Sequence, residues 1–138
     1  MIGAEVDGRV TPADIGLGRM TRKNEDGQAG FVGAQALLRP ALAKTAGRRH
    51  LVGIEAIDGL LLEGSMLLPA LGTEPDGHVT TAAPRVAGEG SIGLALLRDG
   101  QTRLGEILIA SSPTRGLNTR VRVVLPVFYD AEGERYRD

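Results

Sequence analysis

Five Asp-Gly pairs divide this 138-residue chain into short pieces, and they restrict its fold more than any other feature of the sequence. The pairs begin at Asp7, Asp26, Asp58, Asp76 and Asp99. Because Asp-Gly readily adopts the positive φ angles of tight turns, such pairs between short apolar runs are typical of β-hairpins. The pattern predicts a mainly β protein, with a strong hairpin signal at Asp99-Gly100.

The apolar runs that follow His50 have the spacing of a sandwich or barrel. The expected strands cover residues 51–57, 65–68, 78–81, 92–97, 106–110 and 119–125, and residues 127–129 are expected to complete the last one. Within that last run, Arg120 and Arg122 are expected on one face, with Val121 and Val123 on the other. Closing about six strands into a barrel removes the exposed edges of an open sheet, so we predict a small β-barrel.

The stretch before the expected barrel contains one helical pattern, in residues 31–44. Its apolar residues recur at steps of three and four: Phe31, Ala34, Leu37, Leu38, Ala41 and Leu42. Pro40 lies inside this pattern and is expected to end or kink the helix.

The stretch "GEGSIG", from Gly88 to Gly93, has the G-x-G-x-x-G spacing of dinucleotide-binding loops. Such a loop needs a helix after it, because the helix N-terminus binds the phosphate. Only four apolar residues follow, Leu94 to Leu97, before the Asp-Gly pair. We therefore interpret the glycines as a turn before a strand, with nucleotide binding as the minor alternative.

The balance of charges argues against two classes of partner. The 16 basic and 17 acidic residues are well mixed and give a net charge of -1, so there is no basic field for nucleic acid or a membrane surface. No run approaches the roughly 18 apolar residues of a membrane helix. The chain has no cysteine, which excludes disulfides and thiolate metal sites and fits a reducing compartment. We expect a cytoplasmic protein.

No catalytic arrangement follows from spacing alone. A triad of Ser91, His78 and Asp76 is the minor alternative for hydrolysis. His50 and His78 stand far apart without ligand spacing, so we predict no metal site and interpret both as ordinary surface or strand positions. The Arg48-Arg49 pair is interpreted as solvent-facing charge, with an anion site as the minor alternative.

The order of several motifs carries more information than any one of them. They are "GAEVDGRVTPADIGLG" (3–18), "FVGAQALLRP" (31–40), "LVGIEA" (51–56), "LLEGSML" (61–67), "GHVTTAAPRVAGEGSIGLALL" (77–97), "RLGE" (103–106) and "PVFYDAEGERYR" (126–137). In this order the chain resembles the last third of folate-dependent aminomethyltransferases, including the glycine-cleavage T-protein. It is most similar to the C-terminal end of the alpha subunit of heterotetrameric sarcosine oxidase.

The resemblance implies a six-stranded Greek-key β-barrel after a short α/β segment. Residues 1–47 would be the remnant of a folate-binding α/β domain with one helix, and residues 48–138 the barrel. Because the catalytic residues of the family lie upstream of the first matching motif, we expect no activity from this chain alone. It is expected to act in a sarcosine oxidase-like or aminomethyltransferase complex, with tetrahydrofolate as cofactor.

Two departures from the family bear on folate binding. Arg19 stands where relatives carry Trp, and the run from Arg22 to Asp26 includes Glu25 and Asp26 where aminomethyltransferases are basic. Within that run Lys23 is the best candidate for a folate contact, and Arg135 is a second. The acidic residues favour the alternative of a non-catalytic binding or assembly module that has lost folate.

The expected partners are the other subunits, or the remaining N-terminal part, of such a complex, or a second copy of the chain. The helix expected over residues 31–44 would expose its apolar stripe if the sheet on which it packs in relatives were missing. Exposed stripes of this kind are commonly covered by another chain. We therefore expect a homodimer or a hetero-complex.

Overall fold

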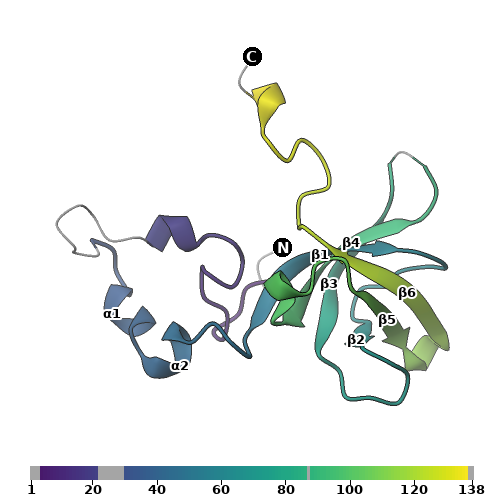
Figure 1. The fold of residues 1–138 in the computed structure, drawn as a ribbon, viewed down its shortest axis with the longest axis horizontal. Coiled ribbons are helices and arrows are strands. Elements are labelled where there is room, and N and C mark those ends of the chain that lie inside the picture. Colours follow the sequence, from purple (N-terminus) through teal and green to yellow (C-terminus); the bar gives the residue numbers. More distant parts are fainter. Residues whose placement is uncertain (1–3, 22–29, 87, 137–138) are drawn as a thin grey trace.

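Six antiparallel strands close into a barrel, which occupies the right-hand side of Figure 1. The computed structural model describes residues 4–21, 30–86 and 88–136. The strands are β1 (Arg49–Ala56), β2 (Met66–Leu68), β3 (Gly77–Pro84), β4 (Ser91–Arg98), β5 (Ile107–Ser112) and β6 (Leu117–Val124). Around the barrel they follow the order β1-β4-β3-β2-β5-β6. Three consecutive strands lie side by side and β1 returns beside β4, which is a Greek-key connection. The predicted fold class is confirmed.

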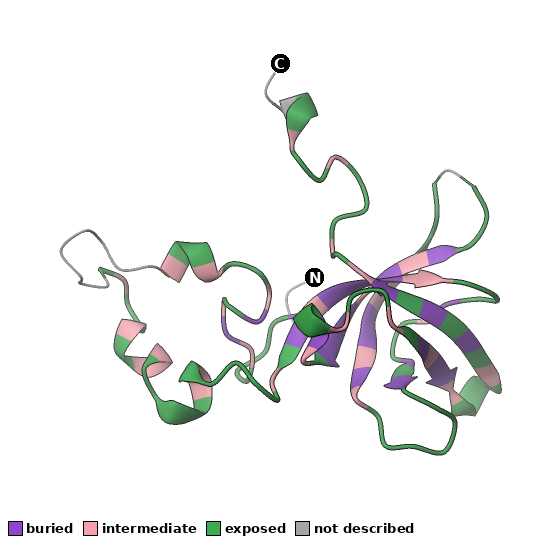
Figure 2. Cartoon of the chain, in the orientation of Figure 1, coloured by how far each residue is buried: buried purple, intermediate pink, exposed green. Residues whose placement is uncertain are grey.

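Alternate residues of the strands belong to the buried core, and Figure 2 shows buried residues concentrated in the barrel. In β6, Val121 and Val123 are fully buried while Arg120 and Arg122 are exposed, as the alternation predicted. The buried core consists of Val52, Ile54, Leu61, Leu67, Val79, Ala95, Leu97, Leu108, Ala110, Val121 and Val123. It is almost entirely aliphatic, so burial of branched and small side chains holds the barrel together.

The glycines of "GEGSIG" form the β3–β4 hairpin, which confirms the turn interpretation. Gly88 and Gly90 have φ angles of 90° and 105°, which side chains other than glycine rarely adopt. Gly93 lies inside β4, where an added Cβ would be 2.4 Å from the carbonyl oxygen of Thr81 on β3. Because β4 follows the glycines directly, they are not followed by the helix that phosphate binding requires.

The predicted hairpin at Asp99-Gly100 is wrong, because β4 and β5 are not neighbours in the barrel. Asp99 does adopt the left-handed conformation, with a φ of 51°, but it leads into the 3₁₀ helix η2 (Gly100–Thr102). Gly100 is buried at the end of β1, where an added Cβ would lie 2.7 Å from Cγ1 of Val52. The Asp-Gly pair therefore turns the chain across the barrel end and not into an adjacent strand.

The segment before the barrel, on the left of Figure 1, contains the 3₁₀ helix η1 (Gly18–Thr21) and two short helices. The single helix expected over residues 31–44 is divided into α1 (Ala34–Leu37) and α2 (Pro40–Ala43). Arg39 is extended between them, at φ −60° and ψ 135°, because the residue before a proline avoids the helical conformation. Neither helix buries a residue.

The chain leaves the barrel as an extended tail that ends in the 3₁₀ helix η4 (Glu134–Tyr136) (Figure 1). The prediction that residues 127–129 complete the last strand is wrong, since β6 ends at Val124. Pro126 lacks the N–H that a ladder needs. The tail then crosses β1 so closely that a Cβ on Gly53 would lie 2.3 Å from the carbonyl oxygen of Leu125. Across the described ranges, no helix has the length and apolar character to span a membrane.

Candidate functional site

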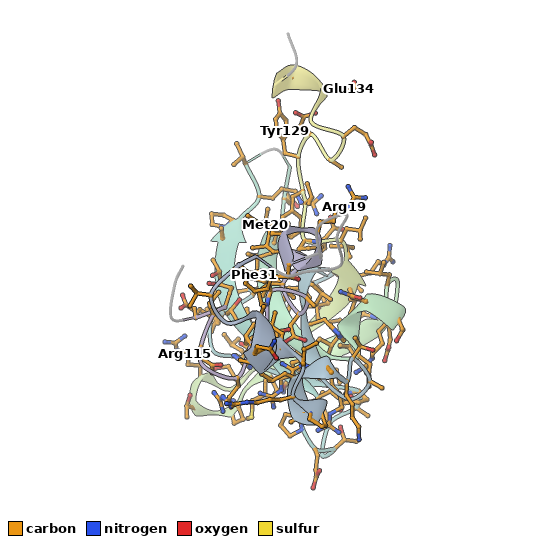
Figure 3. The ribbon with its side chains drawn as sticks, turned by 90° about the vertical axis from the view of Figure 1, so that its left-hand side faces the viewer. Arg19, Met20, Phe31, Arg115, Tyr129 and Glu134 are labelled. Atoms are coloured by element: carbon orange, nitrogen blue, oxygen red, sulfur yellow. The ribbon has the colours of Figure 1, made fainter. Side chains whose placement is uncertain are left out.

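Of the two residues predicted to contact folate, the structure describes only one. Lys23 lies outside the described residues, as does the acidic run that contains Glu25 and Asp26. Arg135 lies in η4, at the end of the tail. Arg19, which we expected at a position where relatives carry Trp, is exposed in η1 (Figure 3).

A turn in the tail determines where Arg135 lies. Asp130 has a φ of 47°, and its carboxylate accepts the backbone N–H of Glu134 at 2.9 Å and that of Arg135 at 3.3 Å. This turn brings the Arg135 guanidinium over the ring of Tyr129, 5.1 Å from the ring centre. Figure 3 shows Tyr129 and Glu134 together on the tail, which stands away from the barrel. A cation over an aromatic ring is attractive, so the contact stabilises the tail's conformation.

A cavity of about 430 Å³ separates this tail from the barrel. The aromatic side chains of Phe128 and Tyr129 form one wall, and the ion pair between Arg85 and Glu55, 2.8 Å long, lies in the other. Its complete lining is Glu55, Arg85, Val86, Ile92, Phe128 and Tyr129. Rings beside a charged pair suit a ligand that combines a flat ring with polar groups.

The sequence contained a signal for this cavity that its interpretation missed. Only four aromatic residues occur in the chain, and Phe128 and Tyr129 are adjacent. Their assignment to a strand obscured their proximity to β1 and β4. Because the strand ends at Val124, both rings are instead carried on the tail and face the barrel across the cavity.

The interpretation of Arg48 as solvent-facing is wrong. Its side chain is 17% exposed and makes a two-pronged ion pair with Asp14, whose side chain is 3% exposed. Nε of Arg48 donates to Oδ1 of Asp14 at 2.8 Å, and Nη2 donates to the other carboxylate oxygen. Burial would raise the pKa of Asp14, but hydrogen bonds from Arg48 and Thr11 outweigh burial and hold that pKa below its ordinary value.

The three residues of the possible hydrolytic triad do not meet. Ser91 pairs with Pro84 in the β3–β4 ladder, whereas His78 pairs with Leu96 at the other end of β3. Six residues of extended chain separate the two positions, roughly 20 Å. Asp76 instead forms an ion pair of 2.9 Å with Arg103. The arrangement excludes the triad.

Both histidines occupy strand positions, as expected. His50 is buried, and its Nδ1 atom has no hydrogen-bond partner within the part of the chain that the structure describes. His78 is half-buried in β3, and its pKa is lowered first by burial and then by the positive charges of Arg49 and Arg9. Among the described residues, no three histidine or carboxylate side chains gather as a metal site would require.

A family model and the curated relatives assign the chain to the same family. Residues 49–130 match the model of the glycine cleavage T-protein C-terminal barrel domain. Over 137 residues the chain is 34% identical to sarcosine oxidase subunit alpha of Rhizobium meliloti (strain 1021), a match that covers 95% of this chain and 14% of the relative. It is 32% identical to an aminomethyltransferase of Geobacillus sp. (strain WCH70) over 129 residues, covering 94% of this chain and 34% of the relative.

A solved structure shares the fold. The glycine cleavage system aminomethyltransferase T from Bartonella henselae superimposes with a TM-score of 0.72 at 21% sequence identity, over 90% of this chain and 33% of that one. The chain thus spans 14% of the length of the sarcosine oxidase subunit and a third of the length of the solved enzyme. The resemblance drawn from the order of the motifs is confirmed. This chain belongs to the family of the glycine cleavage T-protein C-terminal barrel domain.

Proposed function

We propose that this chain is the C-terminal, folate-side portion of a protein like sarcosine oxidase subunit alpha or aminomethyltransferase. In this role it contributes to tetrahydrofolate-linked one-carbon transfer in the cytoplasm, only together with the rest of such an oxidoreductase or transferase. The observation that carries the proposal is the match over 95% of this chain to 14% of a sarcosine oxidase subunit alpha. Because the match covers so small a share of that subunit, we assign the reaction itself to parts of the enzyme outside this chain.

The proposal divides the chain into residues 1–47, a remnant of the folate-binding α/β domain, and residues 48–138, the barrel. Two features support this division. The family match begins at residue 49, where β1 also begins. The helices α1 and α2 bury no residue, as expected of elements whose packing partner is another part of the complex.

Lys23 and Arg135 are the proposed folate contacts. A folate anion carries carboxylates, for which ammonium and guanidinium groups are suitable partners. Arg135 is joined through Tyr129 to the cavity of about 430 Å³, whose aromatic wall would accept a flat ring. The Glu55–Arg85 pair in the opposite wall supplies both an acceptor and a donor for polar ring atoms.

Calorimetric titration with tetrahydrofolate tests this proposal. The titration is run on the chain alone and on a complex purified after co-production with proteins encoded beside it. We expect heat of binding at least in the complex, weakened about tenfold in Lys23→Ala and in Arg135→Ala, because each removes a charge-assisted hydrogen bond. The matched controls are Lys44→Ala and Arg115→Ala, which remove exposed side chains of the same types. The chain alone should not oxidise sarcosine.

The alternative is a binding or assembly module that has lost folate, and Glu25 and Asp26 favour it. A carboxylate near the glutamate end of folate would offset one favourable ion pair. Titration that gives no heat even in the purified complex would establish this alternative and reject the folate proposal. Equal heats for Lys23→Ala, Arg135→Ala and the controls would reject both proposed contacts while leaving folate binding intact.

A further inference from the structure

A second cavity lies at the seam between the N-terminal segment and the barrel. It measures about 390 Å³, and its floor is the outer face of three adjacent strands, β1, β4 and β3. Leu96 of β4 forms the middle of that floor and is only 5% exposed, although its neighbours in the strand point into the barrel. The cavity is lined by Ala4, Asp7, Arg9, Val10, Gly47, Arg48, Arg49, His78 and Leu96.

The roof of this cavity is held in place by contacts on both sides. Oγ1 of Thr81 in β3 donates to the carboxylate of Glu5 at 2.6 Å. Nη2 of Arg48 donates to the carbonyl oxygen of Arg9 at 2.8 Å and also to Asp14. The backbone N–H of Leu51 donates to the carbonyl oxygen of Asp14 at 2.7 Å. The segment and the strands therefore form a preorganised hollow.

Not every charge beside the hollow is paired. Three arginines, Arg9, Arg48 and Arg49, lie there with the carboxylates of Asp7, Asp14 and Glu5. Arg9 is paired with Asp7 and Arg48 with Asp14. The unpaired one is Arg49, whose guanidinium has no ion pair or hydrogen bond with any residue that the structure describes.

His78 lies on the same floor as Arg49, and both face the roof residues Arg9 and Asp7. Burial lowers the pKa of His78 first, and the positive charges of Arg49 and Arg9 lower it further. A neutral imidazole can donate one N–H to an anion beside the guanidinium. The remaining lining, Leu96, Val10 and Ala4, is aliphatic and suits a short hydrocarbon chain.

From this arrangement we propose that the hollow binds a small aliphatic monocarboxylate. Arg49 holds the carboxylate through two parallel hydrogen bonds and His78 donates a third, while the hydrocarbon part lies on Leu96. A single negative charge matches the unpaired guanidinium of Arg49, and the planar fork of a guanidinium matches a carboxylate. This site is separate from Arg135 and the tail cavity, so it does not depend on folate binding.

Proton NMR of the two histidines tests the proposal on the 138-residue chain, with butyrate as the probe at pH 7. We expect the His78 signal to shift in a saturable way while the His50 signal, from inside the barrel, stays in place. Bound butyrate should also raise the pH midpoint of His78, because a nearby anion favours the charged imidazolium. Butyramide has the same shape without the charge and should bind at least tenfold more weakly.

Arg49→Ala and Arg49→Gln should each weaken the binding of butyrate about tenfold or more, because both remove the positive charge. Gln keeps much of the arginine stem, so this variant tests the charge alone. The matched control is Arg122→Ala, which removes an exposed arginine on β6 and should leave the affinity within about twofold. An unchanged His50 signal shows that each variant is folded. Butyrate affinity unchanged in both Arg49 variants, or equal binding of butyramide, would overturn the proposal. Tighter binding of inorganic phosphate than butyrate would overturn the carboxylate assignment.

Discussion

Gly93 lies where strands β3 and β4 leave no room for a larger side chain. An added Cβ there would lie 2.4 Å from the Thr81 carbonyl oxygen and 2.9 Å from a methyl group of Leu61. Since one of these neighbours is backbone, the two strands would have to separate.

We expect Gly93→Ala to lower the free energy of unfolding by about 1 to 3 kcal/mol, the usual cost of overpacking a core. Urea denaturation measures the change. Gly8→Ala is the control, because nothing lies within 4 Å of its added Cβ. Equal stability of both variants would show that β3 and β4 can move apart.

Asp14 makes a contribution to the stability of the fold that depends on pH. Its pKa in the folded protein is below its ordinary value, although burial alone would raise it. Because this pKa is lowered on folding, the carboxylate stabilises the fold fully above its pKa in the unfolded chain, about 3.9. That stabilisation is lost as the pH falls through the pKa of Asp14 in the folded protein.

Replacing Asp14 with Asn should therefore destabilise the chain by about 2 to 3 kcal/mol at pH 7, because it leaves Arg48 half-buried and unpaired. The difference between the two proteins should shrink below about pH 4. Denaturation at a series of pH values checks this. Asp58→Asn breaks the exposed pair with Arg120 and should cost less than about 1 kcal/mol. A difference from wild type that stays constant to pH 2 would contradict the assignment.

At the scale of elements, the N-terminal segment and the barrel are stabilised differently. The barrel has a closed hydrogen-bond ladder and a continuous aliphatic core. The segment has three short helices without a buried residue. It depends on Arg48, whose guanidinium reaches Asp14 and the carbonyl oxygens of Arg9 and Ala41.

Arg48→Ala should release the segment while the barrel persists, because Arg48 contributes nothing to the aliphatic core. We expect amide protons of residues 9–11, 13 and 14 and that of Leu51, which donates to Asp14, to exchange faster, and those of β6 to be unchanged. Hydrogen exchange followed by mass spectrometry or NMR measures both regions. Arg122→Ala is the control. Loss of protection throughout β6 would show that the segment and the barrel unfold as one unit.

For the molecule as a whole, the N-terminal segment exposes large apolar side chains that a monomer would leave in contact with water. Met20 and Leu38 are 76% and 61% exposed, and Val32 is fully exposed. Figure 3, which faces this segment, shows Met20 and Phe31 on it. Of the six apolar residues expected to form a stripe over residues 31–44, Leu38 and Ala41 are exposed and the other four are partly exposed.

We predict that the chain associates through this segment, with itself or with the rest of a complex. Sedimentation at increasing concentration should show association, and Leu38→Glu should reduce it, because a charge cannot be buried there without cost. Leu71→Glu, in the exposed loop between β2 and β3, is the matched control. A single monomeric species for the wild-type chain at high concentration would contradict self-association.

The sequence by itself determined the family, the approximate positions of the six strands and the inward and outward faces of β6. Alternation in β6 assigns Val121 to the core because successive side chains point to opposite faces whatever surrounds them. The order of seven motifs identified the family, which the match over residues 49–130 confirms. Pro40 likewise marked the break in the helix, since its effect on Arg39 is local.

Which strands are neighbours, and which charges are buried, was decided only by tertiary structure. An Asp-Gly pair specifies a turn but not its destination, so Asp99 leads across the barrel end because β1 already occupies the place beside β4. Arg48 and Asp14 are 34 residues apart, and nothing local records their contact. The cavities beside Tyr129 and Arg49 arise in the same way, from segments that meet only because the barrel closes.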